Sequence, residues 1–174
     1  IKHKLREPGY KTMPEMPEDQ NVLVGVTSFL EWEGKHHVKF LWSERILYSQ
    51  KFDYIGTGDF AAIVDDIRCL NDIKSGNGLY NTVRAQTAAY AMADTEETKI
   101  KYGGRWALRI AKETEEEYIE RMKLKNKIRK LLGMKDKVVE PYQVFEAKFL
   151  DENKSSMRDD FAAFLAMWQV MKWD

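Results

Sequence analysis

Apolar residues recur in this chain with two different periods, and this mixture limits the fold more than any other feature. Between His37 and Gln50, large apolar residues occupy every second position at Val38, Phe40 and Trp42, as in a half-buried strand. After Ser156 they recur every three or four positions, as on one face of a helix. We therefore predict an α+β fold, in which an antiparallel sheet built from hairpins carries about four helices. A two-layer sheet sandwich flanked by helices is the alternative.

Runs of β-branched and aromatic residues mark the expected strands. The first run alternates at Val22, Val24 and Val26, and Glu33-Gly34 supplies a turn before the second. Gly103-Gly104 permits the positive φ angles that a two-residue hairpin turn requires. A helix through that region is the alternative. The expected strand regions are 21–30, 37–50, 52–55, a hairpin over 99–111, and 138–150 with an interruption at Pro141.

Helical spacing and capping residues mark four other segments. Asp59 suits an N-cap because its carboxylate accepts the free backbone N–H groups of a first turn. Thr114 and Glu117 fit a capping box, in which each side chain bonds to the backbone of the other residue. Gly133 then ends that helix. The expected helices are 59–70, 79–93, 114–133 and the segment after Ser155 and Ser156.

The length and the proline distribution predict how the chain is organised. A chain of 174 residues is long enough to bury a core without a disulfide or a metal. Pro8, Pro14 and Pro17 lie among charged residues near the start, and proline disrupts both helices and central strands. We predict an extended arm over residues 1–20 and a single α+β domain over residues 21–174.

Charge and cysteine content limit the class of protein. Basic and acidic residues number 28 each, so the chain lacks the basic excess typical of a dedicated DNA-binding protein. It also lacks the net charge that helps to keep proteins monomeric. Cys69 is the single cysteine and lies in an apolar pattern, so we expect a buried thiol and a reducing intracellular compartment, or a particle assembled there. Without a run of about 18 apolar residues, we expect no membrane span.

The most specific enzyme-like pattern consists of Asp136 and Glu146-Ala147-Lys148. On a strand, Glu146 and Lys148 share one face. The pattern resembles the Asp…Glu-x-Lys core of the PD-(D/E)xK nuclease family. This resemblance implies that Asp136 and Glu146 hold a magnesium ion while Lys148 steadies the attacking water. It covers residues 136–148 alone, and a solvent-facing Glu/Lys pair is the alternative interpretation.

Two further patterns bear on ligands. Gly56-Thr57-Gly58 looks like a shortened dinucleotide-binding turn, but an acidic residue is required about 20 positions later, where this chain has Ser75-Gly76-Asn77-Gly78. We interpret it as a tight turn before a helix capped by Asp59. His36 and His37 would point to opposite faces of a strand and cannot easily share one ion. We therefore expect no cofactor.

The segment from Arg121 to Lys130 contains six basic residues at helical spacing. Lys123, Lys127 and Lys130 are the candidates for contacts with nucleic-acid phosphates. A solvated amphipathic helix is the alternative interpretation, because the first half of the same helix is acidic.

Three functional hypotheses result. The first is a non-catalytic structural or assembly subunit, of a phage particle or an organellar complex, whose partners are other protein subunits in a homo- or hetero-oligomer. The others are a metal-dependent nuclease of the PD-(D/E)xK type and a nucleic-acid-associated accessory protein. The candidate interface residues of the first hypothesis are Pro8, Pro14, Pro17, Trp168, Met171 and Trp173.

Overall fold

The computed structural model describes residues 18–76, 78–110, 113–139, 141–152 and 156–172. The predicted arm lies outside the described residues except for its last three positions. In chain order the elements are α1 (Gln20–Lys35), β1 (Val38–Ser49), β2 (Tyr54–Val64), β3 (Ile67–Ser75), α2 (Asn81–Thr98), β4 (Gly104–Ile110), α3 (Glu115–Leu131), β5 (Phe145–Phe149) and α4 (Ser156–Met171).

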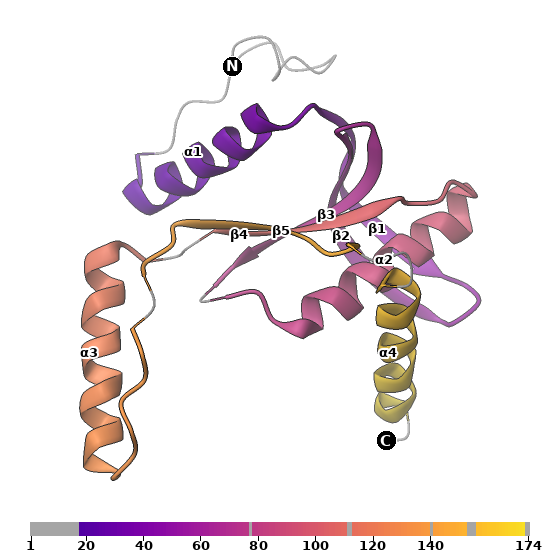
Figure 1. Ribbon diagram of the computed structural model, residues 1–174. Coiled ribbons are helices and arrows are strands. Elements are labelled where there is room, and N and C mark those ends of the chain that lie inside the picture. The colour runs from indigo at the N-terminus through magenta and orange to yellow at the C-terminus, as the bar shows by residue number, and fades with distance from the viewer. Residues whose placement is uncertain (1–17, 77, 111–112, 140, 153–155, 173–174) are drawn as a thin grey trace.

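The strands form one sheet in the order β1-β2-β3-β4-β5 (Figure 1). Three of its four neighbouring pairs are antiparallel, and β3 pairs with β4 in parallel. The parallel pair arises because α2 connects β3 to β4 and returns the chain to the same edge. The α+β prediction is therefore confirmed, with a mixed sheet in place of a purely antiparallel one. The described residues form a single sheet, so the two-layer sandwich alternative was wrong.

The helix α1 covers one face of the sheet (Figure 1). Gly25 lets it approach closely, because a Cβ on that residue would lie 2.7 Å from Cγ2 of Ile110. Farther along the helix, the Phe29 ring meets Phe60 edge to face at 6.0 Å between centroids. Trp32 packs against Trp106 at 5.8 Å. Aromatic burial of this kind anchors the helix to the sheet.

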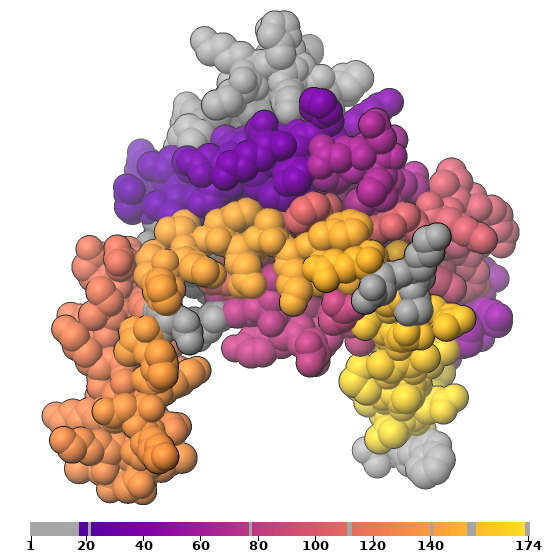
Figure 2. Space-filling view, in the orientation of Figure 1, coloured from indigo at the N-terminus to yellow at the C-terminus, as the bar shows by residue number. Residues whose placement is uncertain are grey.

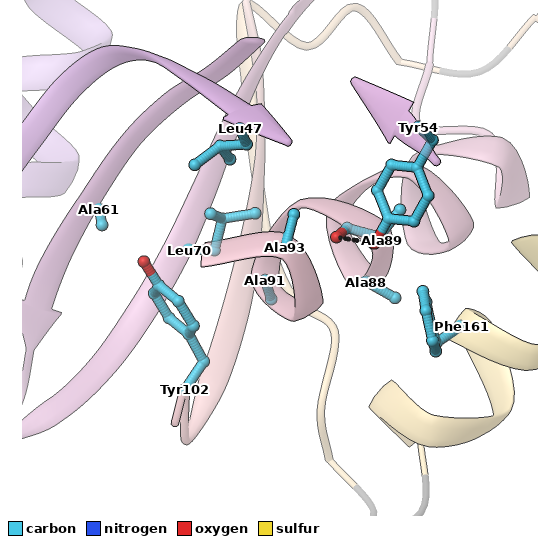
Figure 3. Close-up of a cluster of buried hydrophobic side chains, with 10 residues drawn as sticks. All are labelled: Leu47, Tyr54, Ala61, Leu70, Ala88, Ala89, Ala91, Ala93, Tyr102 and Phe161. Atoms are coloured by element: carbon cyan, nitrogen blue, oxygen red, sulfur yellow. Dashed lines mark hydrogen bonds between the residues drawn. The ribbon is translucent and has the colours of Figure 1, made fainter. Parts of the chain in front are cut away.

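The opposite face of the sheet is covered by α2 and α4 (Figure 1). Here the core is built from Leu47 and Leu70 of the sheet, Phe161 of α4, and a row of alanines on α2 (Figure 3). The small alanine side chains let α2 lie close to the strands and to α4 at the same time. Tyr54 fixes the contact by donating a hydrogen bond to the Ala89 carbonyl at 2.8 Å.

The segment 21–30, which was predicted to be a strand, is the first part of α1. The alternation of valines suggested a period of two, but the residues that face the sheet are Gly25, Phe29 and Trp32. These three are spaced as on one face of a helix. Burial against the sheet therefore outweighs the β-propensity of valine, which depends strongly on context.

The predicted helix over residues 59–70 was also wrong, because this region forms the β2–β3 hairpin. Asp65 and Asp66 form its two-residue turn, with φ angles of 48° and 68°. Both values lie in the left-handed region, as a type I′ turn requires, and Asp adopts this region more readily than most residues. Since helices cover both sides of the sheet, β2 carries a continuous apolar run from Phe60 to Val64 that is easily mistaken for helix.

Of the predicted segment 99–111, the described residues 99–110 form neither the hairpin nor the alternative helix. They contain one strand, β4, which lies between β3 and β5. The capping box of α3 is confirmed: the Thr114 backbone N–H donates to Glu117 Oε2 at 2.8 Å, and the Glu117 N–H donates to Thr114 Oγ1 at 3.3 Å. This signal is local, so the sequence was enough to reveal it.

A buried arginine ties β4 to both helices on the α2 side. Arg105 has no exposed surface and donates two hydrogen bonds to the Asp151 carboxylate, at 2.9 and 2.6 Å. It also donates to Asp160 of α4 at 2.6 Å and to the Arg84 carbonyl of α2 at 2.7 Å. A buried guanidinium needs such partners, and its removal would leave the Asp151 carboxylate without its counter-ion and Asp160 with Arg84 alone.

We predict that Arg105→Ala lowers the free energy of unfolding by about 3–5 kcal/mol, because it leaves buried charge unpaired. Urea denaturation measures the change. The matched control is Arg158→Ala, since the Arg158 side chain is 85% exposed and its removal should cost less than about 0.5 kcal/mol. Equal effects of the two substitutions would show that the buried network does not stabilise the fold.

Candidate active site

Two aspartates meet where the β2–β3 hairpin opens. The strand pairing ends at Phe60 and Asn71, and the next residues on the two strands are Asp59 and Asp72. Beyond this point the Asp59 side chain, and not the backbone of β2, bonds to β3. Its Oδ2 accepts a hydrogen bond from the Ile73 N–H at 2.6 Å. The bond holds Asp59 directly beside Asp72.

Lys74 joins the pair from the same strand. Leu70 packs against the alanines of α2, so alternation along β3 places Asp72 and Lys74 on that same face of the sheet. Lys74 Nζ lies 2.9 Å from both Asp72 oxygens, although the hydrogen-bond geometry is met at Oδ1. Three ionisable side chains therefore converge at the carboxyl end of one strand.

The net charge of this site favours the binding of a cation. Burial raises the pKa of Asp72 to about 6; Lys74 opposes this rise, and the negative charge of Asp59 adds to it. Asp72 is 2% exposed, and its Oδ2 has no hydrogen-bond partner among the residues described. Two carboxylates and one ammonium group leave a net negative charge next to the buried Asp72, and a positive ion would stabilise this charge.

The chemistry of these donors fits a hard divalent cation. Mg²⁺ prefers oxygen ligands and is commonly held by one or two carboxylates, with water and substrate oxygens completing its coordination shell. Within the described parts of the chain, no three His, Cys, Asp or Glu side chains form a metal cluster. Asp59 and Asp72 thus suit a Mg²⁺-type site and not a closed structural zinc site.

A glutamine and a tyrosine of α2 lie on the same side of the sheet. Gln86 donates a hydrogen bond to the Tyr90 hydroxyl at 2.9 Å, one helical turn away. The Tyr90 ring lies against Gly56 of β2, where a Cβ would come within 2.9 Å of the ring atom Cζ. Gly56 therefore makes room for a tyrosine. The tight turn predicted at residues 56–58 is corrected, since these residues are part of the strand β2.

Arg109 fastens the strand end that carries the site. It is 6% exposed and lies opposite Lys74 in the parallel pairing. Its guanidinium donates to the Gly76 carbonyl at 3.2 Å, to the Gln143 carbonyl at 2.8 Å and to Glu146 Oε2 at 3.2 Å. One side chain thus joins the end of β3 to the segment that enters β5.

The predicted nuclease residues are not brought together. Asp136 is exposed in the segment after α3, where its neighbour Lys137 is bonded through its N–H to the side chain of Asn126. Glu146 is on β5 and binds Arg109, and Lys148 is exposed on the same strand. No bond joins Asp136 to either of them among the described residues.

The other predicted site residues have varied surroundings. Trp168 is half-buried and donates its indole N–H to the Phe52 carbonyl at 3.2 Å, whereas Met171 is 70% exposed. The predicted interface residues Pro8, Pro14, Pro17 and Trp173 lie outside the described residues. All three predicted phosphate-binding lysines, Lys123, Lys127 and Lys130, are exposed on α3. Burial raises the pKa of the Cys69 thiol to about 12, in agreement with its predicted buried position.

Asp59, Asp72 and Lys74 were not identified as site residues from the sequence, although they form the type of pattern that was sought there. Like Glu146-Ala147-Lys148, the segment Asp72-Ile73-Lys74 has an acidic residue two positions before a lysine. Asp59 lies thirteen positions before Asp72. The signal was hidden because residues 59–70 were interpreted as a helix that Asp59 capped. An Asp-Asp turn between two apolar runs would have revealed the hairpin.

No known protein family matches the chain in a scan of family models, and no curated protein matches it. Among the described residues, no helix has both the length and the apolar character needed to cross a membrane.

We predict that Gly56→Ala destabilises the fold by about 1–3 kcal/mol, because the new methyl group overlaps the Tyr90 ring. Thermal or urea denaturation measures this change. Gly34→Ala is the control: Gly34 lies in α1 with no atom within 4 Å of an added Cβ, so this change should be neutral or stabilising by up to about 1 kcal/mol. If Gly56→Ala behaves like the control, the close packing of Tyr90 on β2 is wrong.

Proposed function

We propose that this protein is a metal-dependent phosphodiesterase that cleaves nucleic acid. The observation that carries the proposal is the convergence of Asp59, Asp72 and Lys74 at the open end of the β2–β3 hairpin. Their order, Asp…Asp-x-Lys, is the pattern of the PD-(D/E)xK nucleases that the sequence suggested at residues 136–148. It now lies on two paired strands, where the side chains meet.

Each residue has a role that follows from its place. Asp59 and Asp72 supply the carboxylate oxygens for a divalent cation, and Oδ2 of Asp72 is buried, accepts no hydrogen bond and has only the Lys74 ammonium group beside it, at 2.9 Å. When bound, the cation would lower the pKa of a coordinated water and neutralise charge on the phosphate. Lys74 holds its ammonium group 2.9 Å from Asp72, where it can orient the attacking water and stabilise negative charge as it develops.

We predict that the protein cleaves DNA in the presence of Mg²⁺ or Mn²⁺. Asp59→Asn, Asp72→Asn and Lys74→Met should each reduce the rate at least about 100-fold, because each removes a charge that acts on the reacting phosphate or water. Gel-based cleavage assays measure the rate. Denaturation curves of the variants verify that the reduced rate is not a failure to fold.

The control variant is Lys148→Ala, which alters the pattern first suggested by the sequence. Lys148 is exposed and lies outside both the Asp59–Asp72–Lys74 site and the basic segment after α3, so cleavage should stay within about twofold of the wild type, as for an exposed surface change. Loss of activity in Lys148→Ala but not in Asp72→Asn would reverse the assignment of the site.

We also propose different roles for the carboxylates and the lysine. We predict that Asp72→Asn weakens Mn²⁺ binding at least about tenfold, because it removes an anionic ligand. Lys74→Met should retain or strengthen Mn²⁺ binding, because it removes a competing positive charge while abolishing the activity. Isothermal titration calorimetry measures both affinities. Equal weakening of Mn²⁺ binding in the two variants would contradict this division of roles.

The assembly-subunit hypothesis stays a prediction, and one feature of α4 favours it. Met167, Val170 and Met171 are 45%, 70% and 70% exposed near the end of this helix. Exposed apolar patches often mark contacts between proteins. Binding to other protein subunits through α4 would leave the site on β3 free, so this second candidate does not exclude the first.

A further inference from the structure

Residues 113–143 form an arm that leaves the sheet beside the candidate active site. The helix α3 extends away from the sheet, and the chain after it returns along the helix (Figure 1). Asn126 holds the return segment by two bonds to Lys137, and Arg129 Nε donates to the Lys135 carbonyl at 2.7 Å. We call residues 113–143 the α3 arm.

The base of the α3 arm is fixed in place. Arg121 forms a bidentate ion pair with Glu113, at 2.7 and 2.5 Å. The Tyr142 hydroxyl donates to the Glu113 carbonyl, and the Tyr142 ring packs against Tyr118 at 5.6 Å between centroids. Because these contacts join the start and the end of the arm, it projects as a structured element and not as a loose loop.

The outer part of the α3 arm is strongly basic. Between Arg121 and Lys137 the chain carries eight Lys or Arg residues and one Asp, whereas the whole chain has no net charge. Six of the eight are exposed lysines, and none of these six forms an ion pair with a described residue; they are Lys123, Lys125, Lys127, Lys130, Lys135 and Lys137. An unneutralised charge density of this kind attracts polyanions.

The arm and the active site lie at the same end of the sheet, where β3 and β4 have their carboxyl ends. Because β3 and β4 are parallel, Lys74 lies opposite Arg109 and Ser75 lies opposite Ile110. The α3 helix begins only a few residues after that point, at Glu115. Arg109 bridges the Gly76 carbonyl, just after the site, and the Gln143 carbonyl, at the end of the arm. In the space-filling view, an open recess separates the arm from α4 (Figure 2).

We propose that the α3 arm binds the phosphate backbone of the nucleic acid and guides it to Asp59, Asp72 and Lys74. The delivery of nucleic acid to these three residues rests on the proposed function, whereas the binding of phosphates by the arm does not depend on it. Lys123, Lys127 and Lys130 recur at helical spacing on one side of α3 and are its main phosphate contacts. The contacts are to phosphates, so they carry no base specificity.

A protein partner is the competing occupant of the arm. Leu124, Ile128 and Leu131 are 59%, 47% and 80% exposed on another side of α3. However, a second copy of the arm would bring two like-charged segments together, which is unfavourable. The charge of the arm therefore favours a polyanion over a second copy of this chain.

The test is DNA binding in EDTA, where cleavage cannot occur. The triple variant Lys123→Glu, Lys127→Glu and Lys130→Glu should raise the Kd for DNA at least about tenfold at low salt. The slope of log affinity against log salt should flatten by about 0.9 for each phosphate that the variant no longer neutralises on duplex DNA, and by about 0.7 on a single strand. Fluorescence anisotropy with a labelled duplex and with its single strand distinguishes the two forms of DNA.

The matched control reverses three exposed lysines outside the arm, Lys39, Lys51 and Lys101. This variant changes the net charge by the same amount as the arm variant. Because its three lysines lie outside the arm, the slope of log affinity against log salt should stay as in the wild type. If both triple variants weaken binding equally, general charge attraction explains the result and the arm has no special role, which overturns the inference. Unfolding curves verify that both variants are folded.

Two results separate this inference from the proposed function. If the wild type binds DNA through the arm lysines but never cleaves it, the nuclease proposal fails and the arm inference stands. If the wild type cleaves DNA but the arm variant binds as well as the wild type, only the arm inference fails. A third result would overturn the arm inference and identify a protein-docking surface instead. In that case the double variant Leu124→Ser and Leu131→Ser would lower the mass of the protein assembly in solution, and the lysine reversals would leave the affinity for DNA unchanged.

Discussion

The pairing of β2 with β3 determines where the proposed active site lies. Two consecutive left-handed residues, Asp65 and Asp66, set the register, and His36 Nδ1 holds the turn through the Asp65 carboxylate at 2.6 Å. With that register, the pairing opens where Asp59 and Asp72 stand next to each other. A slip of one residue would send Asp72 and Lys74 to the α1 side of the sheet. The site therefore depends on a turn at the opposite end of the hairpin.

Features that depend on local interactions were predictable from the sequence. The capping box of α3 involves Thr114 and Glu117 alone, and the alanine-rich segment of α2 has strong helix propensity. The failures have a different cause. The first helix and the β2–β3 hairpin acquire their structure from burial against other parts of the chain, because β2 and β3 are interior strands of the sheet with helices on both sides. A strand buried on both faces loses the alternating pattern that identifies it.

The candidate site shows how an error in predicted secondary structure can hide a group of residues that lie together in the fold. The same type of pattern was recognised at Glu146-Ala147-Lys148, where the strand prediction was right, but there Glu146 is engaged by Arg109. At Asp72-Ile73-Lys74 the residues were present, and the assumed helix kept Asp59 apart from Asp72. A motif of this kind has meaning only when its residues lie on strands that pair, and pairing is a long-range property that spacing does not reveal.

The zero net charge of the chain was a weak guide because electrostatic attraction acts locally. At physiological salt, charges separated by more than about 8 Å are largely screened, so a phosphate near α3 responds to the arm and not to the sum over the chain. The need for such an arm follows from the site itself. Asp59 and Asp72 place two negative charges against a single lysine, and two such charges repel a phosphate when no cation is bound. An active site of the proposed kind, which must be anionic to hold a metal, therefore requires a separate basic surface to attract its substrate, and the α3 arm lies near the end of β3 and β4 where such a surface would be needed.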